Sequence, residues 1–152
     1  MLKVSEFLNK KKFNIYVLYL ITIALFVSIL HSIITPYFYT EAYLKGKGRD
    51  LIELQYDLYQ DNLTDDELVD IAKKTLVMGD TRASVYKGNV PKSLLSIEKE
   101  SVTRNFHQYH YQVTLTEIIH TENGPDERVE DYEFSIEWDK WRFLINEIRP
   151  VK

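Results

Sequence analysis

Residues 13–35 read FNIYVLYLITIALFVSILHSIIT, and this stretch decides the fold of the chain. No Asp, Glu, Lys or Arg occurs from Phe13 through Thr40, and Leu, Ile, Val, Phe and Ala fill most of the run. As a helix that rises about 1.5 Å per residue, the stretch is roughly 34 Å long, enough to cross a bilayer core with slight tilt. A domain as small as the rest of the chain could not bury such a helix on all sides, so its expected solvent is lipid.

The flanks of the stretch predict its orientation. The tail of residues 1–12 holds four Lys and one Glu, a net charge of +3, whereas the segment after the span opens with aromatic residues. The positive-inside rule therefore places the N-terminus in the cytoplasm and everything after about Thr40 outside the cell membrane, as a single-pass protein. Aromatic side chains near both ends could form the interfacial belts, namely Tyr16, Tyr19, Tyr37, Phe38, Tyr39 and Tyr43.

A cleaved signal peptide is the alternative to an anchor, because it would share the basic start. Its apolar region would be too long, however, and no clear A-x-A-like cleavage site follows, so we predict a retained transmembrane helix over residues 13–35. The chain has no Cys, which excludes a lipid-modified Cys and a disulfide framework.

The remainder, about 112 residues, has the size of one ordinary domain. Of 19 basic and 23 acidic residues in the chain, the tail takes four and one, which leaves 15 and 22 outside, a net charge of −7. Such an acidic exterior argues against nucleic acid and against anionic lipid headgroups as ligands. The expected partners are the membrane, through the span, and other envelope proteins, with self-association as one form of such contact.

An apolar stripe follows the span. Leu44, Leu51 and Leu58 are spaced seven apart and Leu54 adds to the same flank, so we expect an amphipathic helix from about Arg49. The stripe could bind a helix of another chain, which makes these four Leu the partner-helix candidates. Four heptad-like positions are few for a coiled coil, so packing on the domain's own sheet is the favoured interpretation.

Two glycines precede this helix. Gly46 and Gly48 weaken helix propensity, so residues 36–48 are interpreted as a juxtamembrane linker that contains a hinge. Residues 49–152 are then the extracytoplasmic domain.

A second helix is specified by its ends. Thr64 and Glu67 have the spacing of a capping box, in which each side chain accepts a backbone amide of the other. Gly79 is expected to end the helix. Its core face consists of Leu68, Ile71, Ala72 and Leu76.

Alternating patterns predict the sheet. Residues 82–86 and 93–102 are short strand candidates, and a long strand is expected over residues 106–120. An Asn-Gly turn leads to a return strand over about residues 127–138, and residues 141–148 finish the sheet. The last three strands form an antiparallel meander with one buried face against which the helices lie. The predicted fold class is therefore α+β, with a transmembrane helix followed by helices on a curved antiparallel sheet.

This order of elements resembles the cone-shaped nuclear transport factor 2-like superfamily. The resemblance rests on the acidic-aromatic strand, tight turn and WRFLI run of Tyr132 to Ile148, with the helix–loop–helix of Leu51 to Met78 as support. That superfamily includes enzymes, ligand binders and structural modules. Its membrane-anchored members, in type IV secretion and conjugation channels and in Gram-positive cell envelopes, resemble the arrangement of tail, span and outer domain expected here. The usual third helix is missing or very short here, so a cystatin-like helix-on-sheet domain is the alternative.

Motifs for catalysis or metal binding are not found. His107 and His110 are three apart on a predicted strand, so they point to opposite faces and cannot share an ion, while His31 lies alone in the span. No Ser-His-Asp arrangement, Gly-rich phosphate loop or nucleotide fingerprint occurs. We therefore assign no metal, no cofactor and no catalytic residue.

Glu117 is the one acid in an apolar register. It lies between Leu115 and Ile119 on the long strand, where an unpaired carboxylate would be costly. In acid–base enzymes of the resembled superfamily a carboxylate works inside a cone-shaped pocket, so Glu117 is a ligand-pocket candidate, with Tyr109, Tyr111 or Tyr132 as conceivable partners. The structural alternative is a bulge or strand end that lets Glu117 reach water.

The leading hypothesis is a non-enzymatic, membrane-tethered interaction or assembly module of a bacterial cell-envelope complex, such as a secretion or conjugation apparatus. One alternative is a domain that binds or converts a small molecule through Glu117. Another is a membrane-held inhibitor or immunity protein, whose acidic face would dock a basic partner.

The predicted topology can be tested with protease. Protease added to intact cells or spheroplasts should digest the region after Thr40 and spare the Lys-rich tail, which is measured as the mass of the protected fragment. A soluble mature protein that lacks residues 1 to about 35 would contradict the retained anchor.

Overall fold

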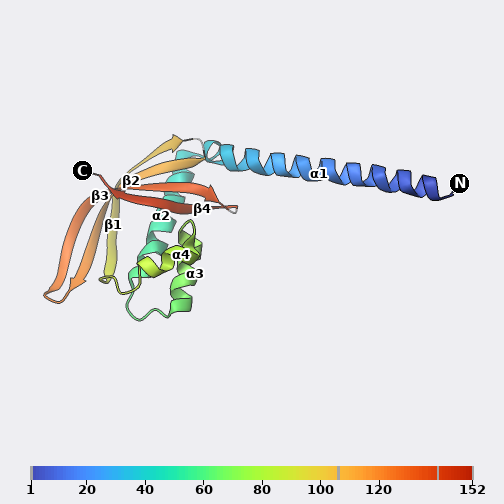
Figure 1. The fold of residues 1–152 in the computed structure, drawn as a ribbon. Coiled ribbons are helices and arrows are strands. Elements are labelled where there is room, and N and C mark those ends of the chain that lie inside the picture. The colour runs from blue at the N-terminus through green and yellow to red at the C-terminus, as the bar shows by residue number, and fades with distance from the viewer. Residues whose placement is uncertain (1, 106, 140, 152) are drawn as a thin grey trace.

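The computed structural model describes residues 2–105, 107–139 and 141–151, and within the first helix the side chains of residues 14–31 and 38. In chain order the elements are α1 (Leu2–Phe38), α2 (Glu41–Tyr56), η1 (Asp57–Tyr59), α3 (Asp65–Thr75), α4 (Gly79–Arg82), η2 (Ala83–Val85), β1 (Lys92–Asn105), β2 (Gln108–Thr121), β3 (Gly124–Asp139) and β4 (Arg142–Pro150). The fold is α+β, as predicted: α1 projects from the domain as a rod, and the shorter helices cover one side of a strongly bent sheet (Figure 1).

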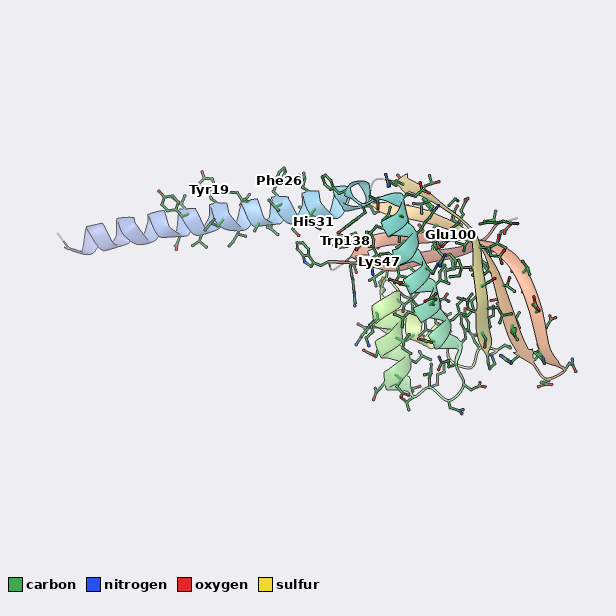
Figure 2. The ribbon with its side chains drawn as sticks, turned by 180° about the vertical axis from the view of Figure 1, so that it is seen from behind. Tyr19, Phe26, His31, Lys47, Glu100 and Trp138 are labelled. Atoms are coloured by element: carbon green, nitrogen blue, oxygen red, sulfur yellow. The ribbon has the colours of Figure 1, made fainter. Side chains whose placement is uncertain are left out.

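The helix α1 contains the apolar stretch. Its segment Asn14–His31 is long and apolar enough to cross a membrane, and the protein buries none of that segment. Tyr19 and Phe26 project from this rod outside the domain and are exposed (Figure 2). The side chains of the Lys-rich tail and of Tyr37 lie outside the described part of the chain.

The two glycines that were expected to form a hinge are helical. Gly46 and Gly48 lie inside α2, which begins at Glu41 rather than near Arg49, and Thr40 caps its N-terminus by accepting the amide of Tyr43 at 3.2 Å. Only two residues separate α1 from α2, so the predicted linker of residues 36–48 is largely helical.

The position of Gly48 is explained by packing. A Cβ atom there would lie 2.5 Å from Cδ1 of Tyr111, so the absent side chain lets α2 approach β2 closely. At Gly46, about half a helical turn away, a Cβ would meet nothing within 4 Å.

The apolar stripe packs inside the domain. Leu44, Leu51 and Leu58 are buried in the core between the helices and the sheet, and Leu54 is half-buried. Packing on the chain's own sheet, the favoured interpretation, is what the structure contains. These leucines, the partner-helix candidates, therefore do not form an exposed stripe that a helix of another chain could bind.

The helix α3 confirms the predicted start and corrects the predicted end. The Thr64 hydroxyl and the Glu67 side chain make both hydrogen bonds of the capping box. The helix ends at Thr75 rather than at Gly79, because Leu76 turns extended and forms a parallel bridge to Ile145 of β4.

Gly79 has a different role from the one predicted. It opens α4, after Met78 has adopted a left-handed backbone. A Cβ at Gly79 would lie 2.3 Å from the carbonyl oxygen of Ala72, so glycine permits this tight corner against α3.

The strand predicted over residues 82–86 is also wrong, since this segment forms the end of α4 and η2. Ala83 and Tyr86 are the buried residues here, and their spacing of three suits a tight helical turn, which the bond from the Tyr86 amide to the Ala83 carbonyl closes at 3.0 Å. The alternation read from the sequence was too short to separate the two structures.

The sheet has four antiparallel strands in the order β1-β2-β3-β4. Thus the strand expected over residues 93–102 is longer and extends the predicted three-strand meander to four. The predicted inward face of β2 is confirmed, with four consecutive odd positions buried: Tyr109, Tyr111, Val113 and Leu115. β1 and β4 are the two edges.

The two α2 glycines form a matched pair for a stability test. Gly48→Ala should lower the free energy of unfolding by about 1–3 kcal/mol, because the added methyl group overlaps the buried Tyr111 ring. Gly46→Ala should raise it by about 0.5–1 kcal/mol, since alanine has the better helix propensity at this open position. The measurement is urea unfolding of the full chain in detergent micelles, and equal effects of the two substitutions would contradict the close approach of α2.

Candidate functional site

Glu117 is the one charged residue that is buried in the described part of the chain. Its side chain is 1% exposed and projects from β2 toward α2. Its Oε2 accepts a hydrogen bond from the Tyr56 hydroxyl at 2.7 Å, and its carboxylate oxygens lie 3.2 Å and 3.3 Å from Nζ of Lys92. The predicted inward position is therefore correct, but the carboxylate does not reach water through a bulge; it is paired.

Three elements bring these groups together. Tyr56 is the last residue of α2, and Lys92 is the first residue of β1. In the β1–β2 register Lys92 faces Ile119 and Leu94 faces Glu117, so Lys92 reaches Glu117 diagonally on the inner face. The Lys92 ammonium also lies 5.4 Å from the centre of the Tyr59 ring, a cation–π arrangement.

Lys92 keeps limited contact with water. Its side chain is 23% exposed, whereas that of Glu117 is sealed. The buried carboxylate of Glu117 is therefore paired with the ammonium group of Lys92, and part of the Lys92 side chain reaches the surface.

The tyrosines around the pair stay neutral. Burial, and then the hydrogen bond to Glu117, raise the pKa of Tyr56 well above its ordinary value. Burial raises the pKa of Tyr59 to about 12. Both hydroxyls therefore remain protonated at physiological pH, and Tyr56 acts as a hydrogen-bond donor to the carboxylate rather than as a base.

The space beside Glu117 is small. A cavity of about 60 Å³ adjoins it, with Tyr132, Leu115 and Phe134 in its wall. Ligand pockets usually enclose roughly 300–1,000 Å³, so this cavity is far below the size that a substrate needs. We define the Glu117 cluster as Glu117, Lys92 and Tyr56. The Glu117 carboxylate is thus closed to all but the smallest molecules, whereas Tyr56 and Lys92 also line a second, larger recess.

The three tyrosines predicted to partner Glu117 bind elsewhere. The Tyr109 hydroxyl donates to the carbonyl oxygen of Leu44 at 3.2 Å, and Tyr132 donates to Glu130 at 2.8 Å. Tyr111 donates to Glu100. Of the three, only Tyr132 shares the cavity of Glu117.

Sequence reasoning missed Tyr56 and Lys92. A tyrosine at the end of an amphipathic helix and a lysine at the start of an edge strand have no distinctive local pattern. The signal that could have found them is the need of a buried carboxylate for a cation, which gives the type of partner but not its position.

A second polar network lies nearer the surface. Glu100 accepts hydrogen bonds from Tyr111 and from Arg49, whose Nη2 lies 2.8 Å from Oε2. Burial raises the pKa of Glu100, but the bonds from Tyr111 and Arg49 outweigh it and hold the pKa below its ordinary range. This network links α2, β1 and β2.

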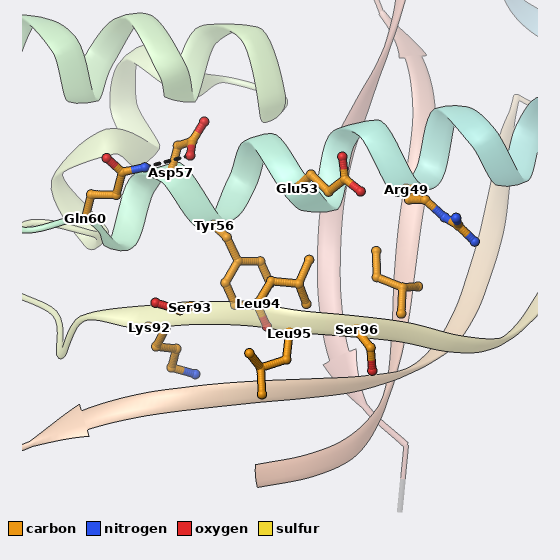
Figure 3. Close-up of a pocket in the computed structure, with 11 residues that line it drawn as sticks. Arg49, Glu53, Tyr56, Asp57, Gln60, Lys92, Ser93, Leu94, Leu95 and Ser96 are labelled. Atoms are coloured by element: carbon orange, nitrogen blue, oxygen red, sulfur yellow. Dashed lines mark hydrogen bonds between the residues drawn. The ribbon is translucent and has the colours of Figure 1, made fainter. Parts of the chain in front are cut away.

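A groove of about 480 Å³ lies between α2 and the start of β1. Tyr56 points from α2 toward β1 across it, with Glu53 and Arg49 farther along the helix (Figure 3). A bulge between Leu94 and Ser96 interrupts the β1–β2 register, and Leu95 there is 54% exposed. We call this recess the α2–β1 groove.

An aromatic cluster joins α1 to the domain. Tyr39 stacks on Tyr43 with ring centres 4.4 Å apart and meets Phe143 edge-on at 5.6 Å, while Trp138 packs on Phe143 at 4.8 Å. Nη2 of Arg104 donates to the Tyr39 carbonyl at 2.9 Å. This junction cluster ties the end of the rod to β1, β3 and β4.

No group of three His, Asp or Glu side chains with the arrangement of a metal site occurs among the described residues. His107 lies in the turn before β2, and His110 lies on β2 with Nδ1 3.4 Å from a carboxylate oxygen of Glu133.

Comparisons with known proteins give little further information. No protein-family model matches the chain, and no curated protein matches it. Among solved structures, the intermembrane-space region of the chloroplast protein ARC6 is similar, with 14% identity and a TM-score of 0.49 over 68% of this chain and 93% of that chain. A likeness this low carries no argument about family or function, and the resemblance to the nuclear transport factor 2-like superfamily stays a prediction.

The Glu117 cluster predicts an asymmetric mutational response. Lys92→Met should lower the free energy of unfolding by about 3–5 kcal/mol, because it leaves a buried carboxylate without its cation. Glu117→Gln should cost about 1 kcal/mol or less, since the amide still accepts from Tyr56 and Lys92 can turn toward water.

The control is the double variant, Lys92→Met with Glu117→Gln, which should recover most of the loss caused by Lys92→Met alone. Urea unfolding of the four proteins measures the coupling. Additive effects of the two substitutions would show that the pair does not interact.

Proposed function

We propose that the chain is a single-pass, membrane-anchored and non-enzymatic interaction module, whose domain lies outside the cytoplasm and binds other envelope proteins. The observation that carries the proposal is the junction cluster. It ties an exposed apolar rod to the sheet with no glycine hinge between them, so an α1 that spans the bilayer would hold the domain in one orientation.

Orientation and retention of the span are part of this proposal. The Lys-rich tail supports a cytoplasmic N-terminus in the cell membrane. The junction adds a reason for retention, because Tyr39 and the Thr40 cap belong to the folded domain and stand directly after α1. Cleavage close to the domain would remove part of its own packing.

The absence of catalysis is supported by the state of the Glu117 cluster. A general acid or base must reach a substrate proton within hydrogen-bond distance. Glu117 already has two partners, and the cavity beside it is about 60 Å³. A structural role for this carboxylate fits these contacts better than a catalytic one.

The α2–β1 groove is the surface we propose for the partner. It runs along β1, an edge strand, where an extended peptide segment can add main-chain hydrogen bonds. The two basic side chains in its wall, Arg49 and Lys92, are already paired with acids, whereas Glu53 and Asp57 make no ion pair in the described part of the chain. With a domain of net charge −7, a basic extended segment is the best match.

A small-molecule site is the second candidate, because the volume of the groove, about 480 Å³, lies within the usual range for ligand pockets. A secretion or conjugation apparatus, which the sequence resemblance implies, is one kind of envelope complex that could supply the protein partner.

Position-specific photo-crosslinking in living cells tests the proposal. A photoreactive amino acid at Leu95, in the groove, should give a discrete adduct with another envelope protein, whereas one at Val129, exposed on β3, should not. Glu53→Lys should weaken the adduct because it removes a negative charge from the groove, and Glu122→Lys in the β2–β3 turn should leave it unchanged.

The tether is tested in the same assay. A domain exported without α1 should give less adduct, because the span raises its effective concentration near membrane partners. The same adduct from Leu95 and Val129, or an undiminished adduct from the exported domain, would contradict the proposal. No protein adduct at all would favour the small-molecule site.

A further inference from the structure

The turn between β3 and β4 exposes a large aromatic side chain. Trp141 is 66% exposed and its backbone has a φ of 67°, a left-handed conformation that is unusual for a bulky residue. Asp139 and Arg142 pair on either side of this turn and close the hairpin. The hairpin thus holds an indole outward where a smaller polar residue would be expected in water.

The exposed indole lies beside α1. The ring centre of His31 is 5.1 Å from that of Trp141 and 5.5 Å from that of Trp138. His31 lies four residues before the end of the apolar stretch of residues 13–35. His31 and Trp138 are seen together where the rod meets the domain (Figure 2), and the β3–β4 hairpin lies on the side from which α1 projects (Figure 1).

From this placement we propose that the tip of the β3–β4 hairpin inserts into the interfacial layer of the bilayer, with Trp141 between the lipid headgroups and the upper acyl chains. The proposal rests on the proposed membrane span of α1. Trp141 is then a second contact of the domain with lipid, contributed by a segment far from the anchor in sequence.

Lipid is the occupant that the surroundings favour. Most of the described side chains of α1 before His31, over residues 14–30, are exposed and apolar, so the surface beside Trp141 is continuous with the surface that faces acyl chains. Tryptophan is enriched at the membrane–water boundary because its ring is apolar and its N–H is polar. The depth also fits, since His31 lies near the outer end of the apolar stretch of residues 13–35, about 6 Å of helix before Thr35.

The inserted tip would restrict rotation of the domain. One helix alone lets a domain turn about the helix axis, whereas a second contact at the side of that axis fixes the direction in which the sheet faces. The junction cluster connects the two contacts, because Trp138 packs on both Phe143 and Tyr39.

Fluorescence quenching tests the inference, since the chain has two Trp residues. In Trp138→Phe the remaining indole is that of Trp141, and the full chain is reconstituted into vesicles of phosphatidylcholine brominated either near the headgroup end or near the methyl end of its acyl chains. Emission from Trp141 should shift to the blue relative to the chain in urea, and it should fall more with the bromines near the headgroups.

A matched control places an indole inside the span. Phe26→Trp, made together with Trp138→Phe and Trp141→Phe, should be quenched more by the bromines near the methyl ends. If position 26 is quenched and Trp141 is not, or if Trp141 prefers the deep bromines, the interfacial insertion is wrong. If position 26 is not quenched by either lipid, α1 does not span the bilayer and the proposed function fails with it.

Discussion

The close contact of α2 with β2 is the constraint on which the rest of the structure depends. Gly48 lets the helix lie directly on the Tyr111 ring, and this fixes where both ends of α2 arrive. At its start, the Tyr109 hydroxyl holds the Leu44 carbonyl, next to the junction cluster. At its end, Tyr56 reaches Glu117. The position of α2 therefore determines both where α1 leaves the domain and where Tyr56 meets Glu117.

The buried pair of Lys92 and Glu117 is better explained by its effect on the register of β1 than by a contribution to stability. Removing two charges from water costs about as much as their attraction returns, so a hydrophobic pair of the same volume would be comparably stable. Lys92 and Glu117, however, can meet in only one register of β1 on β2, and Tyr56 adds the helix to the same contact. A slip of one residue would put Lys92 on the outer face and leave Glu117 unpaired. The cluster can thus select the pairing of an edge strand that carries two bulges.

The sequence predicted what short-range physics determines. The alternation along β2 and the capping box at Thr64 depend on neighbours within a few residues, and both were confirmed. The error at Gly48 has a long-range cause. This residue was interpreted as part of a hinge, but a glycine that weakens a helix and a glycine that admits a partner ring have the same local signature. Lys92 could not be assigned to Glu117, because the β1 bulges shift a register that only the folded sheet defines.

The sheet order decides where the α2–β1 groove can face. The tip of the β3–β4 hairpin stands beside α1, and the β1–β2 turn lies next to it, since the Trp138 amide donates to the His107 carbonyl at 3.4 Å. The groove uses the other end of β1, up to Ile97, eight residues before Asn105. At about 3.3 Å per residue this is at most roughly 26 Å of strand. This length of strand is the upper bound on the distance along β1 between the groove and the end of the sheet that stands beside α1.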